Sequence, residues 1–550
     1  MEKRALIALI LSLLVLLFWE YYFTPQPPRE SGKTETSSPK EEQAVDKPAL
    51  ESVTSNNVGA IKSLQDTSQK MEKWVVKSPS YEAEMVDSGA RLSSIRLLRY
   101  RAFLGKDAPP MELITAKHLG YLPASVDLLG HQNLHLAVIP FKGPEEREVV
   151  LKDGEEKTLQ FSALAEGKIQ VEKIYRWKAD SYMTDLEIKL KNISSEPLND
   201  RLAMSFYFTP YQQEEPSYNV SQLAYYGNKS FNSIDIKSLK KEMKTISLPV
   251  DWVGYQNNYF LQAIIPEADE RYQIVGRVVD DRDSVVQLVY LSESFSLKPE
   301  EERIWKFKIY AGPKEISELK KAGHKLVASI DYGWVGFLAK PLLYLLKWLY
   351  SFTHNYGVAI IILTIIVKLV CWPLTHKSYE SMKKMKQIQP LIAQIREKYK
   401  DDREKLNQEL MTLYRTYKVN PMGGCLPILL QIPIFFALYR MLYSAVELRH
   451  QPFCLWITDL TAPDRLNIGF SIPYLGGLPV LTLLMGATMF IQQKMTPSPG
   501  DPRQEKIMLL MPVMFTVLFI NFPSGLVLYW FVNNILSIAQ QYWIERSSKA

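Results

Sequence analysis

Long apolar blocks on either side of a polar, alternating middle constrain the fold of this 550-residue chain more than any other feature. Apolar residues dominate up to about residue 25 and again after about residue 333. Backbone amides in hydrocarbon must be satisfied within their own segment, so these blocks predict membrane-spanning helices. We therefore expect a polytopic α-helical membrane protein that also carries a separate domain outside the bilayer.

The first segment, residues 1–23 (MEKRALIALILSLLVLLFWEYYF), places Lys3 and Arg4 before an apolar run. A cleaved signal peptide is one interpretation, because the apolar core is short. The absence of an A-x-A-like site and the aromatic end of the run favour an uncleaved transmembrane anchor with a cytoplasmic N-terminus. Residues 24–69 are rich in Pro, Ser, Thr, Glu and Lys, which predicts a disordered linker.

Residues 70–325 predict an all-β domain. The run DLEIKLKN at 185–192 alternates apolar and polar residues as a half-buried strand does, and YQIVGRVV and SVVQLVYL are similar. Many short strands favour a large β-sandwich. The domain has no nucleophile elbow, phosphate loop or HExxH motif, and acid pairs such as Asp280-Asp281 are more typical of solvated turns than of catalytic carboxylates.

The apolar C-terminal part begins with a segment that does not resemble a transmembrane span. Residues 326–354 carry Lys340 and Lys347 in an aromatic, leucine-rich stretch broken by Pro341, which predicts an amphipathic helix in the membrane interface. Residues 355–546 form the expected membrane core. Its five spans are expected at about 355–375, 423–446, 471–492, 507–521 and 525–544. With the anchor, this makes six transmembrane helices.

Charge counts predict the orientation of the spans. The connection from His376 to Lys418 holds eleven Lys and Arg against six Asp and Glu, whereas that from Glu447 to Phe470 holds two against three. The positive-inside rule places the first connection in the cytoplasm and the second outside. Both termini are then cytoplasmic and the β-domain is external.

The cytoplasmic connection, residues 376–420, predicts a helical hairpin. Apolar residues recur at spacings of three and four in two arms, Met385, Ile388, Ile392, Ile395 and Tyr399 in one and Leu406, Leu410, Leu413 and Tyr417 in the other. Between the arms, Asp401 and Glu404 have capping-box spacing. The basic outer faces are compatible with a solvated surface, or with docking to an anionic partner such as ribosomal RNA or lipid headgroups.

The first core span, in the run ILTIIVKLVCWPLTHK, carries Lys368. A charge near the centre of a bilayer costs on the order of 2.5–3.5 kcal/mol on insertion scales. Lys368 lies roughly 10 Å from the cytoplasmic end of its span, so its stem could snorkel to the headgroups. The alternative is that it faces a wet cavity, with Thr364 four residues earlier on the same face.

Other spans carry residues that could line such a cavity. The polar ones are Gln431, Thr482, Thr488, Gln492, Gln493, Asn533, Asn534 and Gln540. The soft apolar ones are Phe435, Met485, Met489, Met511 and Met514, each also compatible with ordinary packing. No acidic residue lies deep in a span as a counter-ion, which favours a cation that receives polar or acidic parts of a guest chain over a proton relay.

Composition argues against several other functions. The net charge is only +6, which does not indicate a nucleic-acid-binding protein. The three cysteines, Cys371, Cys425 and Cys454, are far apart and lack CxxC spacing, so neither a metal site nor a disulfide framework is expected.

Three long motifs resemble the Oxa/Alb/YidC family of membrane protein insertases. They are VNPMGGCLPILLQIPIFFALYRML at 419–442, ELRHQPFCLWITDL at 447–460 and FPSGLVLYWFVNNILSIAQQ at 522–541. The resemblance is strong over 333–546 and weaker in the β-domain, where WVGYQNNYFLQAIIP at 252–266 fits. A large external domain and an N-terminal anchor are typical of the Gram-negative form, which implies the bacterial inner membrane and a periplasmic β-domain.

The resemblance implies five core spans around a hydrophilic groove that opens to the cytoplasm and to lipid. The positive residue of the family's groove, usually arginine, matches Lys368 here. Asp401 and Asp402 match the tip of the family's mobile first cytoplasmic loop, where we expect docking. The expected groove residues are Lys368, Thr364, Gln431, Phe435, Met485, Met489, Tyr529, Trp530 and Asn533, with tryptophan at 530 where tyrosine is usual.

Membership of this family would make the protein an insertase and chaperone of newly made inner-membrane proteins, alone or with the Sec translocon. The expected partners are nascent membrane proteins, the ribosome, the Sec translocon and the phospholipid bilayer, with no specific nucleic-acid sequence. A guest's polar flank would enter the groove while its apolar helix moves into lipid, without a covalent step. The resemblance therefore implies no catalytic residues, no cofactor and no enzymatic activity. The alternatives are a small-molecule transporter, although the sequence has no inverted repeat, and a membrane-anchored enzyme acting through the β-domain.

Overall fold

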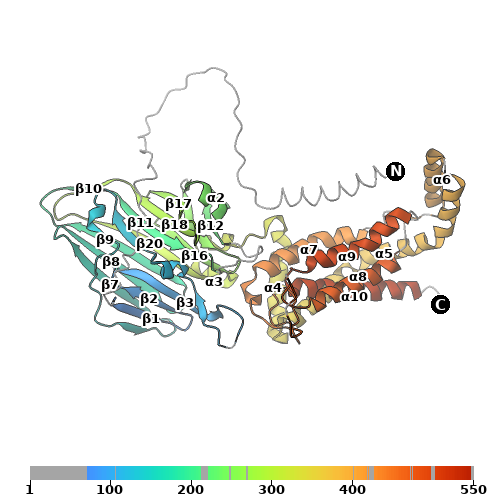
Figure 1. The fold of residues 1–550 in the computed structure, drawn as a ribbon, viewed down its shortest axis with the longest axis horizontal. Coiled ribbons are helices and arrows are strands. Elements are labelled where there is room, and N and C mark those ends of the chain that lie inside the picture. The colour runs from blue at the N-terminus through green and yellow to red at the C-terminus, as the bar shows by residue number, and fades with distance from the viewer. Residues whose placement is uncertain are drawn as a thin grey trace, which may run out of the picture.

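The computed structural model describes residues 71–546 apart from 106, 212–220, 247–248, 268–270, 401, 418, 420–425, 471, 474 and 497–501. A β-domain and a helical bundle are joined end to end, and the long helices of the bundle run along the long axis of the molecule (Figure 1). The expected anchor, 1–23, and linker, 24–69, lie outside the described residues.

Three sheets build the two layers of the β-domain in the described part of the chain. One layer is an eight-stranded antiparallel sheet in the order β13 (Ser230–Asp235), β12 (Gln222–Gly227), β15 (Val250–Gln256), β16 (Phe260–Pro266), β20 (Glu302–Pro313), β9 (Met183–Asn192), β8 (Ile169–Lys178) and β7 (Glu156–Ala165). The other layer holds two five-stranded sheets. Their orders are β4 (Pro110–Glu112), β3 (Arg91–Arg101), β2 (Tyr81–Val86), β1 (Lys73–Lys77) and β6 (Glu148–Val150), and β14 (Lys244–Ile246), β17 (Tyr272–Asp280), β18 (Val285–Ser292), β11 (Leu202–Phe208) and β5 (Ser125–Leu128).

Aromatic contacts join the layers. The rings of Trp74 on β1 and Phe161 on β7 are 5.1 Å apart, and the Tyr290 hydroxyl on β18 donates to the Ile264 carbonyl on β16 at 3.0 Å. The expected strand at 185–192 lies in β9 and mostly alternates buried and half-buried residues, as its sequence predicts. A small β10 (Leu198–Asp200) and β19 (Phe295–Leu297) pair completes the described strands, and the core lies between the two layers.

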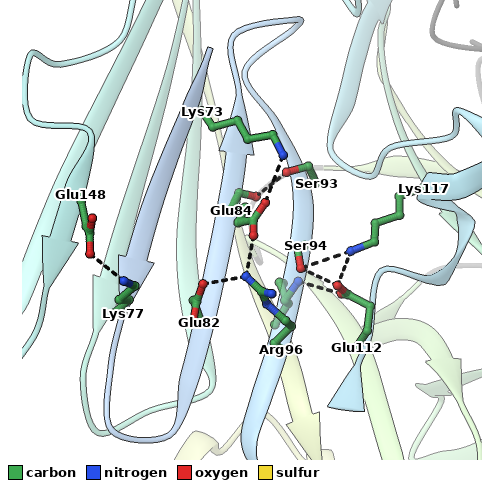
Figure 2. Close-up of polar contacts among 11 residues, drawn as sticks. Lys73, Lys77, Glu82, Glu84, Ser93, Ser94, Arg96, Glu112, Lys117 and Glu148 are labelled. Atoms are coloured by element: carbon green, nitrogen blue, oxygen red, sulfur yellow. Dashed lines mark hydrogen bonds and ion pairs between the residues drawn. The ribbon is translucent and has the colours of Figure 1, made fainter. Parts of the chain in front are cut away.

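The outer face of the β1–β4 sheet is charged (Figure 2). Arg96 on β3 bonds Glu82 and Glu84 on β2 at 2.6 and 2.5 Å, and Lys77 on β1 bonds Glu148 on β6 at 2.6 Å. Partly solvated pairs of this kind each contribute about 0–1 kcal/mol. Their consequence is solubility, because they keep one face of the sheet in water while the other is buried.

The bundle contains a helix for each expected core span. The helices are α4 (Gly336–Thr353), α5 (Tyr356–Lys398), α6 (Arg403–Thr416), α7 (Leu426–Ser444), α8 (Val480–Met495), α9 (Pro502–Phe519) and α10 (Ser524–Arg546). Among the described residues, α5 is the one helix both long and apolar enough to cross a membrane by itself. Met508–Phe519 within α9 is a shorter apolar stretch.

α5 does not end near residue 375, where the first core span was expected to stop. It runs for 43 residues, or about 65 Å at 1.5 Å per residue, which is twice the roughly 30 Å of a hydrocarbon core. The helix continues because its later turns still have partners. Tyr379 and Met382 pack against Ile544 of α10, and the last turns pack against α6.

α8 begins nine residues later than the expected span 471–492. The preceding stretch contains prolines and glycines, and the backbones of Leu466 and Leu478 pair there as an isolated β-bridge. The buried carboxylate of Asp464 accepts a hydrogen bond from the Thr482 amide at 3.0 Å, which satisfies a free N–H group at the start of the helix. Tertiary contacts therefore hold the loop before α8 in place and set where the helix begins.

The far part of α5 packs against α6. Ile388 and Ile392 pack against Leu410, with Val419 beyond them, so the predicted apolar seam is present. The N-cap of α6 is Asp402, whose carboxylate accepts from the Lys405 amide at 3.1 Å, rather than the expected Asp401. Asp401 itself lies outside the described residues.

α4 lies between the β-domain and the bundle (Figure 1). Its buried leucines pack toward α5 and α7, while the opposite face exposes Trp334 of the preceding turn, Phe337, Tyr344, Trp348 and Phe352. This is the amphipathic pattern expected of residues 326–354. Two helices of the β-domain, α2 (Ile236–Lys241) and α3 (Ile316–Ala322), are short, and Lys320 of α3 bonds the Tyr344 hydroxyl at 2.9 Å.

Candidate functional site: a polar stripe on α10

A stripe of buried polar side chains runs along α10. Its members, none more than 7% exposed, are Asn533, Asn534, Ser537, Gln540 and Gln541. Spacings of three and four residues place them on one broad side of the helix. Burying amide and hydroxyl groups without partners costs roughly 1–3 kcal/mol each in proteins, so the stripe needs polar neighbours. We call these five residues the α10 stripe.

Lys368 of α5 meets the stripe at its centre. Its ammonium donates to the Ser537 hydroxyl at 2.6 Å, and that hydroxyl donates in turn to the Asn533 carbonyl at 2.7 Å. Lys368 is 5% exposed, so its charge points into the bundle. In the described part of the chain no carboxylate forms an ion pair with it, so a neutral hydroxyl is its partner.

Two other helices, α7 and α8, and a second residue of α5 also reach the stripe. Gln431 of α7 donates to the Asn533 side-chain oxygen at 3.2 Å, and Thr375 of α5 and Gln540 bond through their side chains at 3.0 Å. On the other side of α10, Asn534 donates to Thr488 of α8 at 3.3 Å. The stripe is therefore the point where α5, α7 and α8 share polar contacts.

An aromatic cluster lies one turn before the stripe. Phe435 of α7 meets Trp530 of α10 edge to face at 4.9 Å, and Phe515 and Phe519 of α9 lie within 6.3 Å of the Trp530 ring. Phe435 is four residues after Gln431, and Trp530 is three residues before Asn533. The same two helices thus present an aromatic contact and a polar contact in adjacent turns.

The remaining expected groove residues have other surroundings. Thr364 is buried, but its hydroxyl bonds the Ile360 carbonyl of its own helix at 2.7 Å, so no described hydrogen bond joins it to Lys368. Met485 and Tyr529 are buried in the core. Met489 is partly exposed and packs against the same core. The structure brings together Lys368, Gln431 and Asn533, and separately Phe435 and Trp530.

Sequence reasoning missed Ser537 and Gln541. Ser537 is four residues after Asn533 and three before Gln540, and Gln541 is four after Ser537 and donates to the Met495 carbonyl at 2.9 Å. Extending the helical spacing from Asn533 would have found both. The partner of Lys368 was therefore visible as a pattern, although not as a contact.

The end of the bundle beside the β-domain is covered by the loop between α7 and α8. Trp456 donates to the buried Asp464 carboxylate at 2.6 Å, and the Ser524 hydroxyl at the start of α10 donates to the Asp459 carbonyl at 2.8 Å. Gly357 at the start of α5 lies against the Phe453 ring, where a Cβ would be 2.0 Å from a ring carbon. These contacts fix the loop over the helix ends.

Comparison with known proteins covers the whole chain. Residues 348–550 match the family described as "60Kd inner membrane protein", and residues 73–345 match "YidC periplasmic domain". A "Membrane protein insertase YidC" of Syntrophobacter fumaroxidans is 55% identical over 99% of this chain and 100% of that protein. The chain belongs to the YidC family. A YidC insertase of Syntrophus aciditrophicus is 39% identical over the full length of both chains.

A solved YidC structure is also similar. The crystal structure of an active YidC insertase with its first transmembrane domain resolved covers 86% of this chain and 93% of its own, at 20% identity and a TM-score of 0.37. As a YidC family member, this chain is an inner-membrane protein, and its β-domain is the periplasmic domain. Among the described residues, no group of three His, Cys, Asp or Glu side chains is placed to hold a metal ion.

Proposed function

We propose that this chain is a membrane protein insertase and chaperone whose core helices enclose a hydrophilic groove for newly made membrane proteins. The α10 stripe carries the proposal, because five buried polar side chains and the Lys368 ammonium lie among otherwise apolar helices. The relatives named insertases support it. They belong to a class that moves proteins without enzymatic chemistry.

Each part of the site has a physical task in insertion. A polar segment that flanks a guest's transmembrane helix is costly to move through hydrocarbon, and hydrogen bonds from the stripe lower that cost. The Lys368 ammonium attracts acidic groups in the segment. The guest helix passes the Phe435 and Trp530 rings into lipid, where burial of its apolar surface supplies the driving force.

The order of residues along α10 supports a groove open to the cytoplasm. α10 starts under the loop that covers the end beside the periplasmic domain, continues through Trp530, and carries its polar stripe only from Asn533 onward. Polar contacts thus lie on the far side of the aromatic cluster. We propose six spans, with both termini and the α5–α6 hairpin in the cytoplasm.

We propose that the hairpin is the docking element for partners at the cytoplasmic surface. It projects beyond the other helices of the bundle (Figure 1), and its exposed cations include Lys384, Lys398 and Lys405. The chemistry fits an anionic partner, and the ribosome is the one we propose, with Asp402 acting as a helix cap that holds the tip. Cooperation with the Sec translocon is a further proposal drawn from the family.

Photo-crosslinking to a stalled nascent membrane protein tests the groove. Crosslinkers at Gln431 and Phe435 are expected to label the nascent chain several-fold more than one at Val370, which is two residues from Lys368 but 75% exposed on the outer side of α5. Equal labelling from all three positions would contradict a groove. Solute flux through the pure protein in liposomes would instead favour a channel.

A further inference from the structure

The hairpin that joins β3 and β4 in the periplasmic domain ends in an apolar tip. Phe103 is 58% exposed and Leu104 is 46% exposed, next to each other in residues 102–105, which we call the β3–β4 tip. Loop tips in water are normally polar, so two adjacent large apolar side chains indicate an interaction surface. Exposed arginines, Arg99 and Arg101, lie just before the tip.

The position of the tip is fixed by the membrane core. Arg449, just after α7, donates from its two terminal nitrogens to the Arg101 carbonyl at 2.5 Å and the Ala102 carbonyl at 2.9 Å. Its guanidinium also lies 5.3 Å from the Phe260 ring centroid of the periplasmic domain. The tip is therefore held beside the point where α7 leaves the bundle.

The same short segment holds α4. Glu447, two residues before Arg449, bonds Lys347 of α4 at 3.0 Å. The other face of α4 carries the exposed aromatic row that begins at Trp334 and ends at Phe352. Because one segment of three residues binds both the tip and α4, the two lie at the same level, between the periplasmic domain and the bundle (Figure 1).

We propose that the β3–β4 tip inserts Phe103 and Leu104 among the phospholipid headgroups of the periplasmic leaflet, as a second membrane contact beside α4. The aromatic ring and the leucine suit the boundary between headgroups and acyl chains, and the two arginines suit anionic headgroups. The contact rests on the proposed insertase function and on the placement of α4 in the membrane interface that its sequence predicts. It holds the periplasmic domain at two points against the bilayer.

Spin-label accessibility in the full-length protein tests this contact. Labels at Phe103→Cys and Phe337→Cys, in a background with the three native cysteines replaced by serine, are compared in vesicles of phosphatidylethanolamine and phosphatidylglycerol. The measured quantity is the ratio of the collision rate with oxygen to that with a water-soluble nickel chelate. This ratio is expected to be at least threefold higher for both labels than for a label at Leu164→Cys. Since Phe103 is exposed, its replacement leaves the fold intact.

Leu164 is a matched control because it is 59% exposed and apolar but lies far from α4. Lys321 of α3 donates to the Asp180 carbonyl in the turn between β8 and β9, so that turn is near α4. Leu164 pairs with Gln170 at the opposite end of the ten-residue strands β7 and β8, about 30 Å away.

The outcomes separate the two proposals. A label at Phe103 that behaves like that at Leu164, while Phe337 is in lipid, overturns the tip contact alone. If the labels at Phe103 and Phe337 are both as accessible to the nickel chelate as the label at Leu164, the tip contact and the interfacial placement of α4 are both overturned. Greater oxygen accessibility at both, relative to Leu164, supports the proposal.

Discussion

Lys368 and Ser537 are 169 residues apart in the sequence, yet the lysine ammonium lies 2.6 Å from the serine hydroxyl in the middle of the bundle. The hydroxyl compensates part of the desolvation of the charge without neutralising it, because serine is uncharged. A buried cation with a neutral partner keeps its attraction for a carboxylate that arrives from outside. This relationship is the basis of the electrostatic role that we propose for the groove.

Replacing Lys368 by alanine is expected to impair insertion of clients with acidic external segments. The loss should be about tenfold, or about 1.4 kcal/mol, because the attraction acts only on negative groups. Neutral clients of the same length should change by less than about twofold, and Lys368→Arg should retain insertion because it keeps the charge. Protease protection in proteoliposomes measures both clients. An equal loss for acidic and neutral clients would count against the electrostatic role.

Replacing Ser537 by alanine tests whether insertion depends on the charge of Lys368 or on the hydroxyl that accepts its hydrogen bond. The variant keeps the ammonium but removes its acceptor, so insertion of acidic clients should fall by no more than about threefold, far less than in Lys368→Ala. Both variants are scored in the same insertion assay, with expression level as the folding control. If Ser537→Ala abolished insertion as fully as Lys368→Ala, the hydroxyl and not the charge would be the functional group.

Replacing Lys347 by methionine is expected to loosen the junction between the periplasmic domain and the core. Lys347 bonds Glu315 at 2.9 Å and Glu447 at 3.0 Å, and the Glu447 side chain is only 9% exposed. Burial raises the pKa of Glu447, and the Lys347 ammonium opposes that rise. Losing the lysine leaves a buried carboxylate without its described ion-pair partner, which should cost about 2 kcal/mol.

Thermal unfolding in detergent measures this effect, with Lys340→Met on the exposed face of α4 as the matched control. Glu447→Gln should be milder, since Lys347 keeps Glu315. The double variant Lys347→Met with Glu447→Gln should lose less than the sum of the two single changes. Strict additivity would contradict a coupled pair.

Periodic features of this fold were predictable from sequence, because they depend on local spacing. The alternation in β9 and the apolar seam from Ile388 to Leu410 both follow from residues a few positions apart. The positions of the helices followed from apolar runs for the same reason. The start of α8 at Val480 was not predictable from an apolar run, because it depends on contacts of Asp464 and the preceding loop with residues distant in the sequence.

Polar partners inside the protein were the least predictable feature. Lys173 faces the core of the periplasmic domain, where it donates to the carbonyls of Gly89 at 2.6 Å and Ala124 at 2.7 Å. Burial and the charge of Arg91 hold its pKa well below the usual value. The alternating pattern of β8 places Lys173 on the same face as the buried Val171 and Tyr175. The pattern does not identify the acceptors, because both carbonyls come from turns distant in the sequence. The Lys368 and Ser537 pair was hidden for the same reason.

The Asp127 carboxyl predicts an unusual pH dependence in the periplasmic domain. Burial raises its pKa from the usual 3.8 to about 6, against hydrogen bonds from the amides of Leu128 and Leu136. The folded state therefore binds this proton more tightly than the unfolded state. The stability contributed by the protonated group is fully present below about pH 4, is lost as pH rises from about 4 to 6, and does not change further above pH 6. Across this pH range the contribution of Asp127 to the free energy of unfolding changes by about 3 kcal/mol.

The variant Asp127→Asn tests that sign, because the amide is neutral at every pH. It should be more stable than the parent at pH 7, by about 2 kcal/mol or roughly 5 °C in melting temperature, and the difference should shrink toward pH 4.5. Circular dichroism of the β-structure across this range is the measurement, with the exposed Asp283→Asn as control. A gain at pH 4.5 as large as at pH 7 would exclude the proposed titration.

Gly486 predicts a close approach between α8 and α9. A Cβ at this position would lie 2.1 Å from the Thr516 hydroxyl oxygen and 3.2 Å from its Cβ, so the two helices meet across a residue without a side chain. Gly486→Ala should force them apart and lower stability by about 1–3 kcal/mol. Adding Thr516→Ala removes the clashing hydroxyl and should recover most of the loss, while Thr516→Ala alone should cost less than Gly486→Ala. Thermal unfolding of the four proteins measures the cycle, and a double variant no more stable than Gly486→Ala would show that the contact with Thr516 is not what requires glycine.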